Sequence, residues 1–183
     1  MKIVSIIIPH YNGKELLHNC INSIYQNISI ENFEIIVVDN GSKDESVKNI
    51  RQLFSDVIII SNKENVGYSG GCNIGAKNAE GKYLIFLNND TVVTENFISE
   101  MINAIITDKK IAICQSLLLK PNGDIDSSGD FLDDLGVVYN SKTKIDHIRE
   151  ISSARGASML IRANIFEKLH GFDEKFFVSF EIE

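Results

Sequence analysis

Short runs of apolar, mostly β-branched residues alternate with segments of helical periodicity through the first 115 residues. The strand-like runs cover residues 3–9, 34–38, 57–61, 83–87 and 111–119. Between them, apolar residues recur at the three- and four-residue spacing of a helix that buries one face. Nearly continuous apolar strands separated by helices predict an α/β fold of Rossmann-like type, with a mostly parallel central sheet covered by helices on both faces.

The second half of the chain follows a different pattern. Pro121-Asn122-Gly123-Asp124 is a turn signal, a long polar stretch follows it, and apolar residues return only at 157–161. A length of 183 residues suits one domain. We expect residues 1–119 to form one half of that domain and 120–183 the other. Because the sequence stops directly after the aromatic-rich segment 176–180, we also expect the domain to be truncated at its C-terminus.

Charge and cysteine usage exclude several classes of protein. The net charge is −7 and no run of Lys or Arg is present, which argues against binding along a nucleic-acid backbone. An anionic ligand must therefore be met by a local metal, a helix N-terminus or a lone Arg. No signal peptide and no apolar run of about 18 residues is visible, so the sequence predicts a cytoplasmic protein without a membrane span. Three widely spaced cysteines predict buried free thiols.

Polar residues follow four of the expected strands. They read P-H-Y-N at 9–12, D-N-G-S at 39–42, S-N-K-E-N at 61–65 and N-N-D-T at 88–91. In an open parallel sheet, ligands bind beyond the carboxyl ends of the strands. The sequence therefore predicts a binding site at this edge of the sheet. The alternative is that these are ordinary solvated loops.

Two carboxylates at this edge have distinct chemistry. Asp39 can accept hydrogen bonds from ring N–H groups or ribose hydroxyls, or it can share a helix cap with Ser42. The pattern from Ser42 to Glu45 is that of a capping box, which predicts the start of the second helix. Asp90, with its oxygen-bearing neighbours Asn88 and Asn89, suits a hard divalent cation that takes further ligands from phosphates. The alternative for Asp90 is a plain Asn/Asp turn.

The stretch N-V-G-Y-S-G-G-C-N-I-G at 65–75 is rich in glycine. Such a segment lets the backbone approach a ligand closely, and the helix that follows can present free N–H groups to a diphosphate. The alternative is a flexible turn before a helix. The stretch matches neither a P-loop nor a dinucleotide-binding fingerprint. The four histidines have no paired-ligand spacing, and no G-x-S-x-G occurs.

Taken together, these residues resemble the family-2 glycosyltransferases of GT-A fold, especially the bacterial rhamnosyltransferase-like branch. The matching blocks, which follow the family's order over nearly the whole chain, are I-I-I-P-H-Y-N (6–12), V-V-D-N-G-S (37–42), N-V-G-Y-S-G-G-C-N-I-G (65–75), F-L-N-N-D-T (86–91), R-G-A-S-M-L-I-R (155–162) and G-F-D-E-K-F-F (171–177). The resemblance implies the fold of a nucleotide-diphospho-sugar transferase.

The resemblance also implies roles for individual residues. The donor nucleotide would be bound by Pro9, Tyr11, Asn12, Asp39, Gly67, Gly70, Asn73 and Asn89. Asp39 would form a hydrogen bond with the pyrimidine base. Asp90 would be the last member of the family's D-x-D motif and would hold Mg²⁺ or Mn²⁺ against the diphosphate, although Asn88 replaces the first Asp. Arg155 and Gly156 would border the sugar and the acceptor.

The general base is the least complete part of the resemblance. In the family, this base belongs to a Glu-Asp pair soon after the G-F-D-E block. This sequence has E-I-E at 181–183 and then ends, so Glu181 is the nearest match. The pair is therefore altered or cut off.

The implied function is inverting transfer of a sugar from TDP-rhamnose or a UDP-sugar to a glycan or lipid-linked acceptor. This reaction would serve cell-surface polysaccharide synthesis, in the cytoplasm or at the inner face of the plasma membrane. A non-catalytic nucleotide-sugar-binding module is the alternative. A nucleotidyltransferase of related architecture would need a G-x-G-T-R loop after the first strand, where this chain has P-H-Y-N-G-K.

Overall fold

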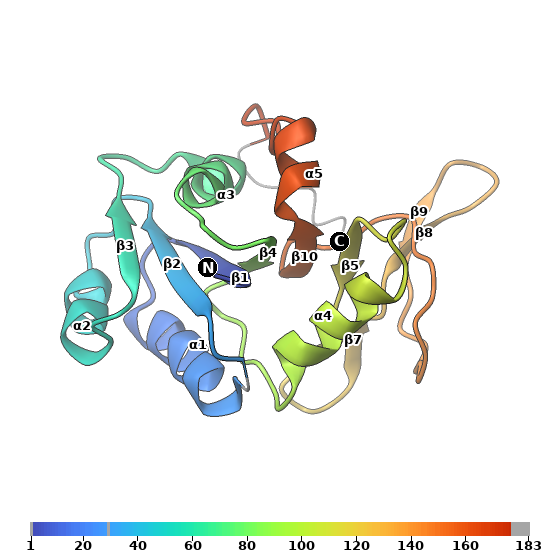
Figure 1. Cartoon of the computed structure of the whole chain (residues 1–183), viewed down its shortest axis with the longest axis horizontal. Helices are drawn as coiled ribbons and strands as arrows, with labels where there is room; N and C mark the ends of the chain where they lie inside the picture. The colour runs from blue at the N-terminus through green and yellow to red at the C-terminus, as the bar shows by residue number, and fades with distance from the viewer. Residues whose placement is uncertain (1, 29, 177–183) are drawn as a thin grey trace.

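A six-stranded sheet forms the centre of the molecule in the computed structural model, which describes residues 2–28 and 30–176 (Figure 1). Its strands, in spatial order, are β3 (Ile58–Ser61), β2 (Phe33–Asp39), β1 (Val4–His10), β4 (Tyr83–Leu87), β10 (Ser158–Arg162) and β5 (Ile113–Gln115). β1 to β4 are parallel, and β10 runs antiparallel to both β4 and β5. The mostly parallel sheet predicted from the sequence is confirmed. Because β10 lies between β4 and β5, both halves of the chain share one sheet.

Helices cover both faces of this sheet (Figure 1). One face carries α1 (Lys14–Asn27), α2 (Ser46–Leu53) and α4 (Phe97–Thr107), and the other carries α3 (Gly67–Lys77) and α5 (Ala163–Lys168). The alternation of side chains along a strand separates two buried apolar clusters. In β1, Ile6 and Ile8 join the cluster under α1, whereas Ile7 joins the cluster under α3.

The glycine-rich stretch allows α3 to lie directly on the sheet. A Cβ atom added at Gly75 would lie 2.3 Å from Cγ2 of Ile7, and one at Gly71 would lie 3.1 Å from Cβ of Pro9. A larger residue at position 75 would therefore push the helix away from β1. At these two positions, glycine serves helix-to-sheet packing.

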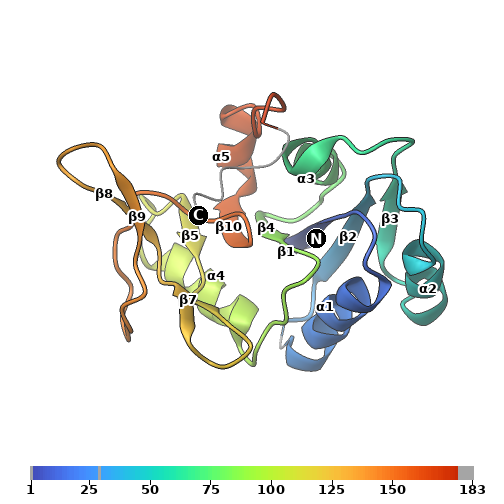
Figure 2. The ribbon, with the colours of Figure 1, turned by 180° about the vertical axis from the view of Figure 1, so that it is seen from behind.

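The chain between β5 and β10 forms two small sheets outside the central one. β6 (Leu118–Leu119) pairs with β7 (Ile125–Ser127), and β8 (Asp130–Leu132) pairs with β9 (Val138–Asn140). The β8–β9 hairpin projects from the body of the molecule in both Figure 1 and Figure 2.

One sequence prediction in this region is wrong. The apolar run at 111–119 does not form a single strand but divides into β5 and β6. The division falls at Ser116, whose hydroxyl donates a 2.7 Å hydrogen bond to Oγ of Ser158. β6 then leaves the central sheet to pair with β7.

The predicted capping box is also wrong. α2 begins at Ser46, and the side chain of its N-cap residue, Glu45, makes no capping hydrogen bond. Oδ1 of Asp44 instead accepts the N–H of Ser46 at 3.1 Å. The hydroxyl of Ser42 accepts the N–H of Asn12 at 2.8 Å, so it is used to join two loops.

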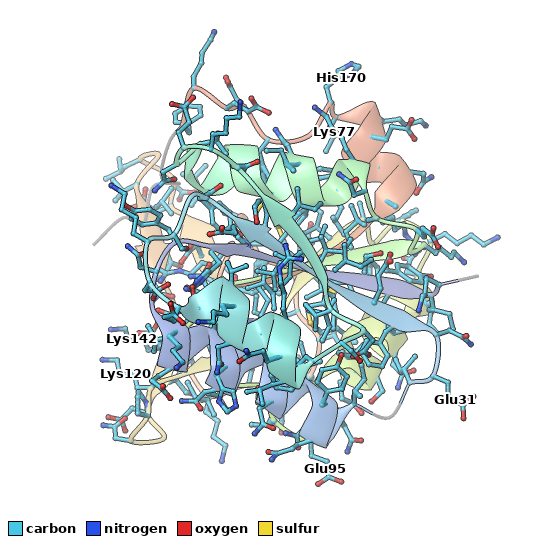
Figure 3. The ribbon with its side chains drawn as sticks, turned by 90° about the vertical axis from the view of Figure 1, so that its left-hand side faces the viewer. Glu31, Lys77, Glu95, Lys120, Lys142 and His170 are labelled. Carbon is cyan, nitrogen blue, oxygen red and sulfur yellow. The ribbon has the colours of Figure 1, made fainter. Side chains whose placement is uncertain are left out.

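Several charged side chains lie at the periphery of the fold. Figure 3 labels Glu31, Lys77, Glu95, Lys120 and Lys142, which are exposed and point away from the sheet. Within residues 2–28 and 30–176, no helix combines the length and the apolar character required to cross a bilayer.

Candidate active site at the carboxyl ends of the strands

The ends of β1, β2 and β4 meet at one edge of the sheet. His10 and Asp39 are register neighbours on β1 and β2, and the N–H of Asn40 donates to the carbonyl of His10 at 2.8 Å. Across β1, Nδ1 of His10 lies 2.8 Å from Nδ2 of Asn89, which follows β4. The segments that carry Asp39 and Asp90 are thus at the same edge, as the sequence predicts.

Asp39 is almost completely buried, with 5% of its surface exposed. Its Oδ1 accepts the N–H of Ser42 at 2.9 Å, which stabilises the loop before α2. Its Oδ2 accepts no hydrogen bond from the described residues. Asp39 therefore orders its own loop with one oxygen and has the other available for a ligand.

The loops around Asp39 are held by hydrogen bonds between the ends of β1 and β2. The N–H of Lys43 donates to Oδ1 of Asn12 at 2.9 Å, and Asn12 in turn donates its N–H to Ser42. Asn12 has a positive φ of 56°, a conformation that Asn tolerates better than most residues. Beside it, Tyr11 is 47% exposed, and its ring is accessible at the edge of the sheet.

Asp90 presents an exposed carboxylate that makes no hydrogen bond or ion pair with the described residues. Nowhere in the described part of the chain do three His, Cys, Asp or Glu side chains gather closely enough to hold a metal ion. One exposed carboxylate fits a hard cation that retains several waters and takes its other ligands from phosphate oxygens. A metal bound here would therefore depend on the ligand that it accompanies.

The thiol of Cys20 lies beneath this edge. Its Sγ is 3.6 Å from the carbonyl oxygen of Asn88. Burial, and secondarily the charge of Asp90, raise the pKa of Cys20 to about 12, so the thiol stays neutral at physiological pH. All three cysteines are free, as the sequence predicts.

His10 connects the strand ends through its two ring nitrogens. The residue is 1% exposed, and its Nε2 lies 2.8 Å from Oγ of Ser46 at the start of α2. The Ser46 hydroxyl donates to Oδ1 of Asp44. Burial lowers the pKa of His10, while the charges of Asp39 and Asp44 oppose this shift. This role of His10 was not predicted from the sequence, where the available signal was a polar residue at the end of an otherwise apolar strand.

The glycine-rich segment lies close to this edge, with Gly67, Gly70 and Asn73 all buried. The carbonyl of Gly67 accepts a 3.0 Å hydrogen bond from Nδ2 of Asn40. The amide of Asn73 donates to the carbonyl of Phe172 and to Oε1 of Glu174, both at 2.9 Å, and accepts the N–H of Phe172 at 2.9 Å. Asn73 therefore ties α3 to the loop after α5. Contact of Asn73 with a nucleotide stays a prediction.

The predicted acceptor-side residues lie next to the end of β4, because the N–H of Asn88 donates to the carbonyl of Ala157 at 3.1 Å. The guanidinium of Arg155 forms an ion pair with Asp130, with Nε 3.2 Å from each carboxylate oxygen. Asp130 was not predicted from the sequence. Glu181, the predicted base, lies outside the described residues.

Gly156 allows close approach of an aromatic side chain. The hydroxyl of Tyr68 donates to the carbonyl of Gly156 at 2.6 Å, and a Cβ atom at position 156 would lie 2.5 Å from that hydroxyl oxygen. This contact connects the glycine-rich helix with the block that precedes β10.

Two hollows of the described structure lie away from the strand-end carboxylates. One, of about 770 Å³, lies beside β5 and is bounded by residues 145–151. The other, of about 840 Å³, lies between α3, α5 and the loop at 170–174. Neither is lined by Asp39 or Asp90. The surface around Asp39 and Asp90, at the ends of β1, β2 and β4, is called the strand-end shelf below.

The family model described as "Glycosyl transferase family 2" matches residues 5–169 of the chain. An uncharacterized glycosyltransferase of Rickettsia bellii is 32% identical over 179 residues, which cover 94% of this chain and 25% of the relative. The minor teichoic acid biosynthesis protein GgaB of Bacillus subtilis is 37% identical over 103 residues, which cover 54% of this chain and 11% of the relative. The chain thus spans about a quarter or less of the length of these relatives.

Solved structures share the fold. TarS 1–349 of S. aureus in complex with UDP superposes with a TM-score of 0.74 at 16% identity, over 97% of this chain and 52% of that one. The mannosyltransferase PcManGT of Pyrobaculum calidifontis, in complex with GDP-Man and Mn²⁺, gives a TM-score of 0.69 at 16% identity, over 93% and 47%. The predicted GT-A fold is confirmed.

Proposed function

The chain belongs to glycosyl transferase family 2, and from that premise we propose that its strand-end shelf binds a nucleotide-diphospho-sugar for inverting transfer to an acceptor. The observation that carries the proposal is the position of two available carboxylate groups at one edge. Oδ2 of Asp39 is free for a base or ribose, and Asp90 is free for a cation. The hydrogen bond between His10 and Asn89 joins the segment that carries Asp90 to the strand beside Asp39.

The parts of the shelf suit the chemistry of this reaction. Displacing a nucleoside diphosphate from the anomeric carbon builds negative charge on the departing phosphate, and a divalent cation such as Mg²⁺ or Mn²⁺ would stabilise that charge. Asp90 would hold the cation. Tyr11 and Asn12 would border the nucleotide, because they lie on the loop that follows β1, directly beside Asp39. Pro9, a buried residue near the end of β1, would line the pocket from below. A carboxylate must also take the proton of the acceptor hydroxyl on the opposite face of the sugar. Glu181 is the residue that we propose for this step.

The finer assignments rest on relatives and motif blocks. TarS binds UDP, and PcManGT binds GDP-Man with Mn²⁺, which supports a nucleotide-sugar donor and a divalent cation here. GgaB acts in teichoic acid biosynthesis, which supports a glycan or lipid-linked acceptor in polysaccharide synthesis. The proposed location at the inner face of the membrane rests on the resemblance alone. The rhamnosyltransferase-like branch and TDP-rhamnose rest on the sequence blocks alone.

The metal role of Asp90 is tested by titrating the chain with UDP, with and without Mn²⁺, in a calorimeter. We expect Mn²⁺ to tighten UDP binding and Asp90→Ala to lower the affinity in Mn²⁺ by about tenfold or more, since one charge-assisted ligand is lost. Asp134→Ala is the matched control, because Asp134 is an exposed carboxylate in the β8–β9 turn. Equal affinities of the Asp90 and Asp134 variants would remove the metal role.

A non-catalytic nucleotide-sugar-binding module is the second candidate. It is favoured by the sequence E-I-E at 181–183, where the family has a Glu-Asp pair. Hydrolysis of the donor in the presence of Mn²⁺ separates the two candidates. Release of free sugar that depends on Asp90 supports the transferase, and tight donor binding without any turnover supports the module.

A further inference from the structure

The hydrogen bonds of His10 have a defined direction. Nδ2 of Asn89 lies 2.8 Å from Nδ1 of His10 and 3.4 Å from the carbonyl oxygen of Asn12. Because a carbonyl oxygen only accepts, the Asn89 atom that faces both groups must be its N–H-bearing nitrogen. Nδ1 of His10 is therefore an acceptor.

The remaining bonds follow from this direction. A neutral imidazole that accepts at Nδ1 carries its proton on Nε2, so it donates to Oγ of Ser46. The Ser46 hydroxyl is then free to donate to Asp44, whose carboxylate only accepts. The second oxygen of Asp44 receives the N–H groups of Gly13 at 2.8 Å and Lys14 at 3.1 Å. One directed chain therefore connects the ends of β1 and β4 with the starts of α1 and α2.

We propose that His10 is the positioning residue of the donor site, and that it turns the amide of Asn89 so that its oxygen faces the ligand. The inference rests on the proposed function. With its nitrogen held by His10 and Asn12, Asn89 has an amide oxygen that accepts no hydrogen bond from the described residues. An amide oxygen accepts hydrogen bonds and can also coordinate a hard cation, but the exposed carboxylate of Asp90 is the cation ligand of the proposed function. We assign to the Asn89 oxygen a hydroxyl of the donor, on either the ribose or the transferred sugar.

A matched pair of substitutions at one position tests this role. The side chain of Asn places its amide atoms near the position of Nδ1, so His10→Asn keeps an acceptor for Asn89 and loses the bond to Ser46. The longer Gln reaches the position of Nε2, so His10→Gln keeps the bond to Ser46 and releases Asn89. The two variants thus divide the chain of hydrogen bonds on opposite sides of position 10.

We expect His10→Gln to weaken donor binding by about tenfold, the effect of one lost hydrogen bond, and His10→Asn by no more than about threefold. Thermal unfolding of both variants gives the structural comparison. If the affinity of each variant simply follows its stability, His10 is only a structural residue and the proposal is overturned. The opposite order of affinities would also overturn it.

A substitution of Asn89 identifies the hydroxyl. In the absence of a divalent cation, Asn89→Ala should weaken UDP and UDP-GlcNAc by about tenfold alike if the ribose provides the hydroxyl, and UDP-GlcNAc alone if the sugar provides it. A loss of affinity that is seen only with Mn²⁺ would make Asn89 a cation ligand and contradict the proposed contact. Asn103→Ala, at an exposed position of α4, is the control. Unchanged affinity for both ligands in the Asn89 variant would contradict the proposed contact.

Nitrogen NMR separates failure of this inference from failure of the proposed function. The ¹⁵N spectrum of His10, assigned by its loss in His10→Asn, should show an unprotonated Nδ1 and a protonated Nε2 in the unliganded protein. The reverse tautomer would overturn the positioning role whether or not UDP binds. Absence of UDP binding by the unsubstituted chain, with the expected tautomer present, would count against the proposed donor and leave His10 oriented as inferred.

Discussion

The region from β1 to β4 and the region from β6 to β9 are stabilised in different ways. In the first, strands such as β1 and β2 are buried along almost their full length between helices. In the second, strands of two or three residues carry exposed apolar side chains, and Leu135 in the hairpin turn is 88% exposed. Burial of apolar surface stabilises the first region, whereas bonds between polar side chains and backbone hold the second.

Arg149 illustrates the second kind of stabilisation. Its Nη2 donates to the carbonyl of Ser128 and to the hydroxyl of Ser141, both at 3.0 Å, and its guanidinium lies 4.6 Å from the ring centre of Phe131. In the turn, Asp133 accepts two backbone N–H groups with one oxygen. These contacts have no period in the sequence. The structure of residues 120–155 could therefore hardly be predicted from the sequence, whereas the strands of the first region could be predicted from their apolar runs.

The largest effect is expected where α3 meets β1. Gly75→Ala places a methyl group 2.3 Å from Cγ2 of the fully buried Ile7. We expect a loss of about 2 kcal/mol in the free energy of unfolding, because an overpacking cost of about 3 kcal/mol outweighs a gain of about 1 kcal/mol in helix propensity. Urea denaturation measures the change.

Gly123→Ala is the comparison in the second region. Nothing lies within 4 Å of a Cβ at Gly123, but its φ is +88°. The cost there is conformational alone, about 1 kcal/mol. A Gly123 variant as unstable as the Gly75 variant would contradict the contrast between the two regions.

A local effect is expected at the hairpin. Arg149→Ala removes the hydrogen bonds to Ser128 and Ser141 and the contact with Phe131, so the β8–β9 region should open more readily by about 1–2 kcal/mol. Hydrogen exchange of the amides in β8 and β9 measures this, with Lys142→Ala as an exposed control. The amides of β1 and β2 should keep their protection. Loss of protection throughout the sheet would show that the two regions unfold together.

A smaller effect is expected from pH. Burial lowers the pKa of His10 below its ordinary value of 6.5, although the charges of Asp39 and Asp44 oppose the shift. Between this lowered pKa and 6.5 the unfolded chain binds more protons than the folded one, so stability falls as pH decreases through that window. His10→Asn should remove this component, and His170→Asn, at an exposed histidine, should keep it.

Asp44 affects the stability of the fold in a different pH range. Burial alone would raise its pKa, but hydrogen bonds from Ser46, Gly13 and Lys14 lower it below 3.8. Its contribution to the free energy of unfolding is fully present above about pH 3.8 and is lost as the pH falls below that value. Thermal unfolding temperatures measured from pH 8 to pH 3 separate the two residues. A stability that is constant between pH 7 and pH 5 in the unsubstituted chain would contradict the account of His10.

The sequence predicted the positions of the strand ends better than the hydrogen bonds between the side chains of the site. The apolar runs placed Asp39 and Asp90 correctly at one edge, because parallel strands that are joined by helices bring their carboxyl ends together. The pairing of His10 with Ser46 spans 36 residues, and no local pattern indicates it. The ion pair of Arg155 with Asp130, 25 residues apart, could not be predicted for the same reason.

Misread local patterns have a physical explanation. The sequence from Ser42 to Glu45 satisfies the capping-box pattern, but tertiary partners compete for the same side chains. Ser42 is used by Asn12, and Asp44 is used by the start of α1. Asn73 similarly binds the loop at Phe172, which periodicity cannot predict. The hydrogen-bond partners of polar side chains at the site are thus determined by the tertiary structure more than by the local sequence.

The central claim is that the ends of β1, β2 and β4, and not the hollow beside β5, bind the nucleotide. Titration of the ¹⁵N-labelled chain with UDP and Mg²⁺, followed by amide chemical shifts, tests it most directly. We predict that the largest shifts fall at residues 9–14, 39–46 and 88–91. Shifts confined to residues 111–117 and 145–151, which line the hollow of about 770 Å³, would contradict the account.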